Sequence, residues 1–254
     1  RATVFMAGHP NAAGRSDYRP DEKDDGKPAC HAFHAPSHPP QPAMRPLFAL
    51  LALVSCSFAA EPVQLTLADF TNLNGEPPAG GWQAEGESVI HLAGKGGGNL
   101  LSKSEYKNFV LEWEWKLNAK GNNGIKYWVT KIGGKEWLGI EYQMIDDSGH
   151  PDGLKGGSHT TASIYDIKEP VAGKLVKPAG EWNSSKIVVQ DGKLQHWLNG
   201  ALAAEADTTT PEWKAMIAKS KFKNKEGFAP GQGKIMLTEH GDETWFRNIR
   251  ITAN

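Results

Sequence analysis

The sequence predicts an all-β domain, built as a sandwich of two antiparallel sheets with one short helix. Short runs of β-branched and aromatic residues recur along residues 61–254, turn residues separate them, and one segment alone carries helix signals. Many short strands of this kind close as a two-sheet sandwich or a jelly roll. The segment shows no repeat and no internal linker, so we expect residues 61–254 to form a single domain.

The clearest strand covers residues 109–117. Its apolar residues fall on one face, which consists of Phe109, Leu111, Trp113, Trp115 and Leu117. An apolar residue at every second position is typical of a strand with one buried face. The same criteria predict strands at residues 63–67, 88–92, 124–129, 138–145, 186–190, 194–198, 234–239 and 244–251.

Turns and the helix have local signals of their own. Asp191-Gly192 and Asn199-Gly200 separate predicted strands and favour tight hairpin turns. Thr210 followed by Pro211 and Glu212 is typical of a helix start, with a capping hydroxyl, a proline at the first position and an acid in the first turn. We expect that helix to continue through residues 213–222, about three turns.

An export signal precedes the domain. Residues 44–60 begin with Met44 and Arg45, continue with an apolar run and end in small residues, as a secretory signal peptide does. Residues 1–43 then form an upstream extension, either untranslated or disordered. Residues 53–56 also resemble a lipobox, so cleavage before a lipid-anchored Cys56 and cleavage near residue 60 stay open as alternatives. Either alternative predicts an exported protein of the periplasm or cell envelope.

Composition excludes several classes of function. The net charge of −1 offers no basic surface for nucleic acid. The zinc motif H-E-x-x-H is absent, and an EF-hand starting at Asp146 would need an acid where Gly157 stands. The sequence thus predicts no cofactor and no metal ligands, and leaves a divalent metal open. Nine Trp favour either sandwich cores or a carbohydrate ligand.

Two predicted strands carry the candidate chemistry. Lys126 and Trp128 share one side of strand 124–129, and Glu141 and Gln143 share one side of strand 138–145. If these strands are neighbours, then an ammonium, an indole, a carboxylate and an amide meet on one face. Such a set suits a sugar, and the alternative is a solvated outer face.

The segment after the second of these strands adds three further candidates. Asp146, in a turn-rich acidic stretch, is a candidate for substrate binding together with Trp128 and Gln143. His159 is a candidate acid or base, and Tyr165 is a candidate hydrogen-bond donor. A conventional glycosidase with the strand motif E-x-D-x-E is not favoured, because Lys116 stands at the third position after Glu112 and Glu114.

A series of short motifs in a fixed order resembles the 3-keto-disaccharide hydrolase domain family. The motifs are Gly81-Trp82, residues 101–113, Asn123-Gly124-Ile125, residues 141–146, residues 180–183, residues 198–200, and the ending from His240-Gly241 to residues 246–249. The resemblance spans residues 63–252. It implies a concanavalin-A-like jelly roll and hydrolysis of glycosides whose sugar carries a ketone at C3.

The resemblance also implies a mechanism by elimination and rehydration. It assigns the base to Glu141 or His159, enolate stabilisation to Lys126, proton transfer to His240 or Tyr165, and sugar stacking to Trp128. The family often has Arg near the position of Lys126. A non-catalytic carbohydrate-binding module remains the main alternative, since one fold serves many functions.

Overall fold

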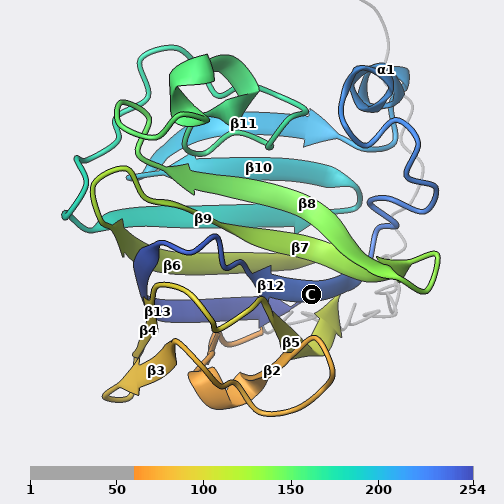
Figure 1. Ribbon diagram of the computed structural model, residues 1–254. Helices are drawn as coiled ribbons and strands as arrows, with labels where there is room; N and C mark the ends of the chain where they lie inside the picture. The colour runs from red at the N-terminus through yellow and green to blue at the C-terminus, as the bar shows by residue number, and fades with distance from the viewer. Residues whose placement is uncertain (1–59, 254) are drawn as a thin grey trace, which may run out of the picture. The chain divides into compact units, whose positions relative to one another are not determined.

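The computed structural model describes residues 60–253, which form two antiparallel β-sheets packed face to face (Figure 1). The eight-stranded sheet has the order β11-β10-β9-β6-β13-β4-β3, with β1 paired to β13. Its strands are β1 (Val63–Gln64), β3 (Trp82–Glu85), β4 (Val89–Ala93), β6 (Phe109–Leu117), β9 (Asn183–Gln190), β10 (Lys193–Leu198), β11 (Ala201–Asp207) and β13 (Glu243–Ala253).

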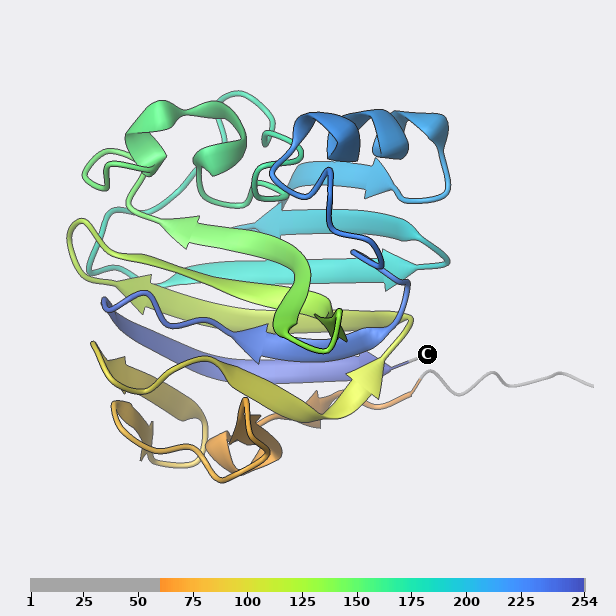
Figure 2. The same cartoon turned by 45° about the vertical axis from the view of Figure 1, so that its right-hand side comes forward.

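The second sheet has five strands in the order β2-β5-β12-β7-β8. They are β2 (Phe70–Asn72), β5 (Leu100–Tyr106), β7 (Asn122–Ile132), β8 (Glu136–Ile145) and β12 (Gly233–Leu237). Three short 3-10 helices (Leu67–Asp69, Gly153–Lys155 and Gly157–His159) and the helix α1 (Pro211–Lys219) complete the described elements. In Figure 2, the segment after β8 and the helix α1 lie at the same end of the sheets. The predicted all-β sandwich with one helix is confirmed.

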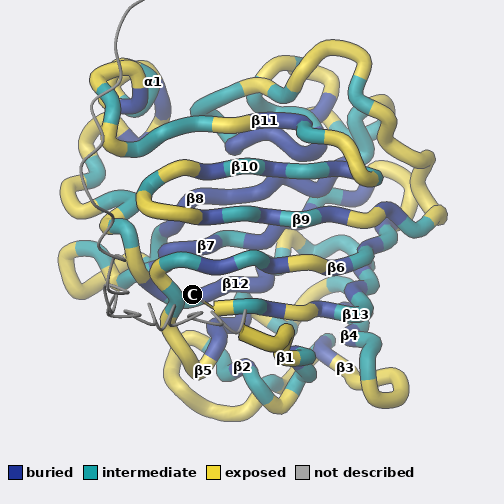
Figure 3. The backbone as a smooth tube through the Cα atoms, turned by 180° about the vertical axis from the view of Figure 1, so that it is seen from behind, coloured by how far each residue is buried: buried dark blue, intermediate teal, exposed yellow. Residues whose placement is uncertain are grey.

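Burial alternates along the central strands, as Figure 3 shows for β6, β9 and β10. All five apolar residues predicted to share one face of β6 are buried in the common core. Both predicted hairpins are present: Asp191 and Asn199 adopt positive φ angles of 49° and 48°, each followed by a glycine at 85°. Asp-Gly and Asn-Gly favour these tight turns because both residues of each pair tolerate positive φ angles.

Four strands escaped prediction, namely β2, β3, β5 and β11. These strands are short or, like Ala201–Asp207, poor in β-branched residues. Their extended conformation depends on pairing with a neighbouring strand, which local sequence does not reveal. The predicted helix starts at Pro211 as expected, with the side chain of Thr210 accepting from Trp213. It ends at Lys219, earlier than predicted, because Ser220 has an extended backbone and both its N–H and its hydroxyl group donate to Ile217 O.

A β-bulge interrupts the pairing of β7 with β8 between Tyr127 and Thr130. Trp128 adopts φ 51° there, and the alternation of β7 inverts. Both Tyr127 and Trp128 belong to the main core, whereas Val129 joins a separate apolar cluster with Leu101 and Met236. One extra residue in a strand re-aims the side chains that follow it.

A polar network crosses the core between the sheets. His196 is fully buried, with its Nε2 3.1 Å from the Tyr127 hydroxyl and its Nδ1 3.1 Å from the carbonyl oxygen of Ser163. Since a carbonyl only accepts, Nδ1 carries the proton and the tyrosine hydroxyl donates to Nε2. The hydrogen bond from His196 to Ser163 therefore connects β10 to the segment after β8.

The predicted extension, signal peptide and lipidation site Cys56 lie before residue 60, outside the described residues. Among residues 60–253, no helix is long and apolar enough to cross a membrane.

Candidate functional site

Glu141 lies on the outer face of the five-stranded sheet with only 5% of its side chain exposed. Lys126 is its direct cross-strand partner on β7, and Lys126 Nζ lies 3.5 Å from Glu141 Oε2. His240 follows β12, and its Nε2 lies 3.9 Å from Glu141 Oε1. Each carboxylate oxygen therefore faces a different nitrogen. The two strands are neighbours and bring the predicted ammonium and carboxylate groups together.

The absence of a side chain at Gly124 makes room for this carboxylate. A Cβ at Gly124 would stand 2.5 Å from Glu141 Oε1 and 3.1 Å from its Cγ. Gly124 pairs with Gln143, two residues beyond Glu141 on β8. Glycine at this position of β7 is thus a condition for the position of Glu141, since any larger residue would displace the carboxylate.

The environment keeps Glu141 ionised. Burial raises the pKa of its carboxyl group, but the Lys126 ammonium group and the contact with His240 outweigh burial, so this pKa lies below its ordinary value. The carboxylate is therefore present at neutral pH in a site with little water. The side chains of Lys126 and His240 are 18% and 39% exposed, and they mark where the site meets solvent.

The segment after β8 places a second group of residues beside this pair. Asp152 accepts a hydrogen bond of 2.8 Å from the Tyr165 hydroxyl and lies 3.1 Å from His159 Nδ1. His159 Nε2 lies 3.5 Å from Asp166 Oδ1, so carboxylates face both nitrogens of the ring. The backbone N–H of Tyr165 donates to Glu141 O, which fixes this segment against β8.

Two pKa values in this group shift strongly. Burial raises the pKa of Asp152, but hydrogen bonds from Lys155, Tyr165 and His159 outweigh it and bring this pKa to about 2. Burial, followed by the hydrogen bond to Asp152, raises the pKa of Tyr165. Tyr165 therefore remains a neutral donor and Asp152 a permanent acceptor at neutral pH.

Lys221 is a member of the site that the sequence did not reveal. Its Nζ lies 4.1 Å from the centre of the Tyr165 ring, and its backbone N–H donates to Asp166. Burial lowers the pKa of Lys221, an effect that the Glu141 carboxylate opposes. The residue follows α1, far along the chain from the other members, and no local pattern distinguishes it from nearby lysines.

The predicted sugar-binding residues Trp128, Gln143 and Asp146 do not form an exposed sugar-binding surface in the structure. Trp128 is 1% exposed and its indole N–H donates to Lys107 O, so the prediction of a stacking surface is wrong. The bulge in β7 is the reason. Gln143 is 2% exposed, and its backbone pairs with that of Ala162 and Ser163. Asp146 holds its own turn, accepting from the backbone N–H groups of Lys120, Ser148 and Gly149.

Within the described residues, no group of three or more His, Cys, Asp or Glu side chains has the arrangement of a metal site. The titratable side chains gathered at this site are Glu141, Lys126, His240, Lys221 and the Asp152–His159–Tyr165 group. This set offers a carboxylate base, cations for a developing negative charge and neutral proton donors.

Comparisons with known proteins agree on one family. Residues 66–252 match the family model described as a 3-keto-alpha-glucoside-1,2-lyase-like domain. A 3-keto-disaccharide hydrolase of Bacteroides thetaiotaomicron is 35% identical over 179 residues, which are 61% of this chain and 61% of that protein. The match thus spans less than two thirds of that relative.

Two solved structures from Parabacteroides distasonis, both described as candidate glycosyl hydrolases, share the fold. One is 30% identical with a TM-score of 0.66, covering 74% of this chain and 89% of its own. The other is 25% identical with a TM-score of 0.59, covering 76% and 98%.

Proposed function

Since the chain belongs to the 3-keto-alpha-glucoside-1,2-lyase-like domain family, we propose that it cleaves glycosides whose sugar carries a ketone at C3. The observation that carries this proposal is the buried Glu141 carboxylate between Lys126 and His240. A conventional glycosidase needs two carboxyl groups facing each other across a glycosidic bond. Here nitrogen bases flank a single carboxylate, and this arrangement suits proton abstraction beside a ketone.

The reaction proceeds by elimination and rehydration. The C3 ketone acidifies the proton at C2, and Glu141 removes it to give an enolate. The electron pair then forms the C1–C2 double bond while the C1–O bond breaks, and the departing oxygen takes a proton. Water next adds to C1 of the resulting enone, and a proton returns to C2, so the sum is hydrolysis.

Glu141 suits the role of base better than His159. Its carboxylate is ionised and faces Lys126 and His240, at the point where the site opens to solvent. His159 has carboxylates at both ring nitrogens, so it must break a contact with Asp152 or Asp166 before it accepts a proton from a substrate. We assign His159 to the support of Asp152 and Tyr165.

The cations stabilise the enolate oxygen. Lys126 Nζ lies 3.5 Å from Glu141 Oε2, and Lys221 Nζ lies over the ring of Tyr165. Fixed positive charges in a site with little water stabilise a developing oxyanion more than they would in bulk solvent. The side chain of His240 is 39% exposed, against 18% for Lys126, and we assign to His240 the exchange of protons with the leaving oxygen and with water.

The test compares a 3-keto-glucoside with its unoxidised parent, using wild type and Glu141→Gln. We expect wild type to cleave the oxidised substrate alone, and the variant to lose about 100-fold or more in kcat/KM, the usual range for a positioned base. Glu205→Gln on β11 is the matched control, because Glu205 is an exposed carboxylate of the other sheet.

Isotope incorporation tests the order of events. In D2O, the proton returned to C2 comes from solvent, so the first product formed carries deuterium at C2. Equal turnover by wild type and Glu141→Gln, cleavage of the parent alone, or binding without turnover would each overturn the proposal. The last outcome would favour a carbohydrate-binding module.

We also propose that the protein is exported through residues 44–60, with the periplasm or cell envelope as its location. Fractionation of cells that express the full chain tests this, and labelling with a radioactive fatty acid, lost in Cys56→Ser, distinguishes a lipid anchor from simple cleavage. Full-length protein that stays in the cytoplasm would overturn export.

A further inference from the structure

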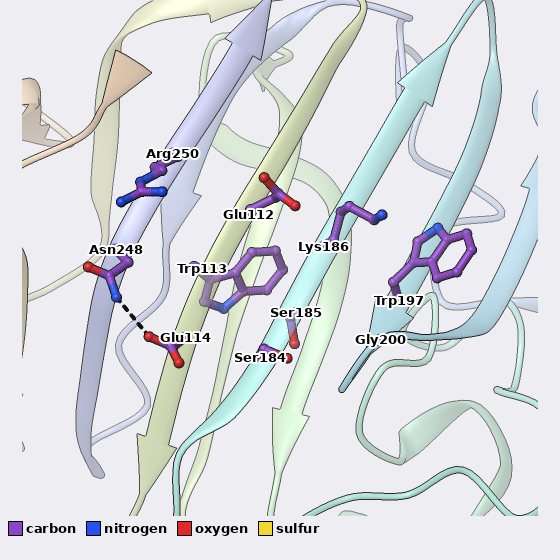
Figure 4. A pocket seen from close by; sticks show the side chains of 10 residues that line it. All are labelled: Glu112, Trp113, Glu114, Ser184, Ser185, Lys186, Trp197, Gly200, Asn248 and Arg250. Carbon is purple, nitrogen blue, oxygen red and sulfur yellow. Dashed lines mark hydrogen bonds between the residues drawn. The ribbon is translucent and has the colours of Figure 1, made fainter. Parts of the chain in front are cut away.

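A hollow of about 370 Å³ lies on the outer face of the eight-stranded sheet, on the side of the sandwich opposite to Glu141 (Figure 4). Four adjacent strands contribute to it, namely β10, β9, β6 and β13. The inward residues of β6 form the core, so the residues between them, Glu112 and Glu114, face this outer surface. The hollow therefore shares no residue with the site described above.

Strand register builds one wall of the hollow. Trp197 pairs with Lys186, Lys186 pairs with Glu112, and Glu112 pairs with Arg250. These four side chains thus form one row across four neighbouring strands, as direct cross-strand partners do. An indole and three charged groups stand side by side in this row.

The floor of the hollow is low beside the row of Trp197, Lys186, Glu112 and Arg250, where the neighbouring pair of residues includes a small serine. Ser184 pairs with Glu114, two residues along from the row of Trp197. Glu114 is held down by Arg247, at 2.8 Å, and by the amide group of Asn248, at 2.7 Å. A short side chain beside a row of long ones leaves the depression that Figure 4 shows.

No ion pair joins Glu112, Lys186 or Arg250 to an opposite charge among residues 60–253. Arg250 Nε donates a hydrogen bond of 3.4 Å to Gln64 Oε1, which does not line the hollow. Lys186 Nζ lies 4.5 Å from the centre of the Trp197 ring, a cation–π contact that its flexible stem can exchange for a hydrogen bond to a ligand. Lys116 lies in the same way over Trp245 and Trp182, but neither of these tryptophans lines the hollow.

We propose that this hollow is a second, non-catalytic binding site for a neutral saccharide. Carboxylates and cations both bind hydroxyl groups, and the indole supplies an apolar wall for a sugar ring. Two carboxylates (Glu112 and Glu114) and two cations (Lys186 and Arg250) line it, so a charged ligand would meet like charge whichever sign it carried. The volume lies near the lower end of the range for small-molecule sites, about 300–1,000 Å³, which suits a short saccharide.

The test follows the indole N–H signal of Trp197 by NMR, assigned by its loss in Trp197→Ala. Maltose, cellobiose and trehalose are the neutral probes, and glucuronic acid and glucosamine are the charged ones. None carries a C3 ketone, so the measurement does not depend on turnover at Glu141. We expect at least one neutral disaccharide to shift this signal. Binding should be at least ten-fold weaker in Ser184→Leu, measured by the same signal, and in Trp197→Ala, measured by isothermal titration calorimetry.

Two further variants keep the result interpretable. Trp245→Ala removes a tryptophan of the same face outside the hollow and should leave the affinity unchanged. Glu112→Gln keeps the shape of the hollow and removes one charge, so it tests the site even if Trp197→Ala does not fold. The proposal is overturned if no neutral probe shifts the signal, if a charged probe binds more tightly, or if every hollow variant binds as wild type does.

Discussion

The side chain of Glu141 on β8 occupies the space that a side chain at Gly124 on β7 would fill. A Cβ on the glycine would stand 2.5 Å from the carboxylate oxygen that faces His240. The backbone of Gly124 is extended, so the lack of a side chain is what counts, not freedom of φ. The strand β7 carries a glycine here because the proposed base occupies the space where its side chain would lie.

Gly124→Ala should therefore displace the carboxylate without removing it. We expect kcat/KM for a 3-keto-glucoside to fall about 100-fold, because a displacement near 1 Å in a catalytic group has that effect. Steady-state kinetics check this. Gly86→Ala, at a turn with open space around it, is a control for general loss of stability, and equal effects of both variants would contradict the prediction.

Lys126→Gln should move the acid limb of the pH–rate profile. Lys126 is the largest of the influences that lower the pKa of Glu141, so its removal raises that pKa. A base must be ionised to act, and activity should then be lost at higher pH on the acidic side than in wild type. A profile of kcat/KM against pH measures the shift, and an acid limb at the same pH in both proteins would exclude Glu141 as the titrating base.

His196 should make stability depend on pH. Burial lowers its pKa to about 4, and hydrogen bonds to Ala162 O and Ser163 O only partly oppose burial. The unfolded chain binds a proton near pH 6.5, whereas the folded protein does not until about pH 4. Stability from this group is thus complete above pH 6.5 and falls as pH decreases toward 4.

The total change from His196 is on the order of 3 kcal/mol, from the shift between those two pKa values. Urea denaturation at several pH values measures it, and His196→Gln, which cannot titrate, is the comparison. We expect the free energy of unfolding of the variant to vary less between pH 7 and pH 4.5. Parallel curves for the two proteins would contradict this prediction.

Trp128→Ala should destabilise the fold by about 3–5 kcal/mol, the cost of removing a large buried aromatic side chain. Trp128→Phe should cost less and leave KM for the substrate unchanged, because the Trp128 side chain is buried in the core with 1% of its surface exposed. Chemical denaturation and kinetics measure the two effects. A raised KM in Trp128→Phe with unchanged stability would restore the stacking role that the sequence predicted.

The sequence predicted which site residues share a face wherever the regular alternation of side chains along a strand is maintained. Lys126 precedes the bulge and Glu141 lies on a regular strand, so period two correctly placed both side chains on one shared face. Trp128 stands two residues after Lys126 and shares its predicted side, yet the bulge turned it into the core. A bulge depends on the partner strand, which local sequence does not specify.

Taken alone, the sequence determined the sandwich, its two tight hairpins, the start of α1 and the family resemblance. All of these depend on side-chain period, on the few residues that tolerate left-handed angles, or on the order of motifs along one chain. Only the tertiary structure brought His240, Tyr165 and Lys221 to Glu141, and only strand register lined up Trp197 with Lys186 on the opposite face. These groups are far apart in the chain, and the pairing of whole strands, rather than any local preference, sets the distances between them.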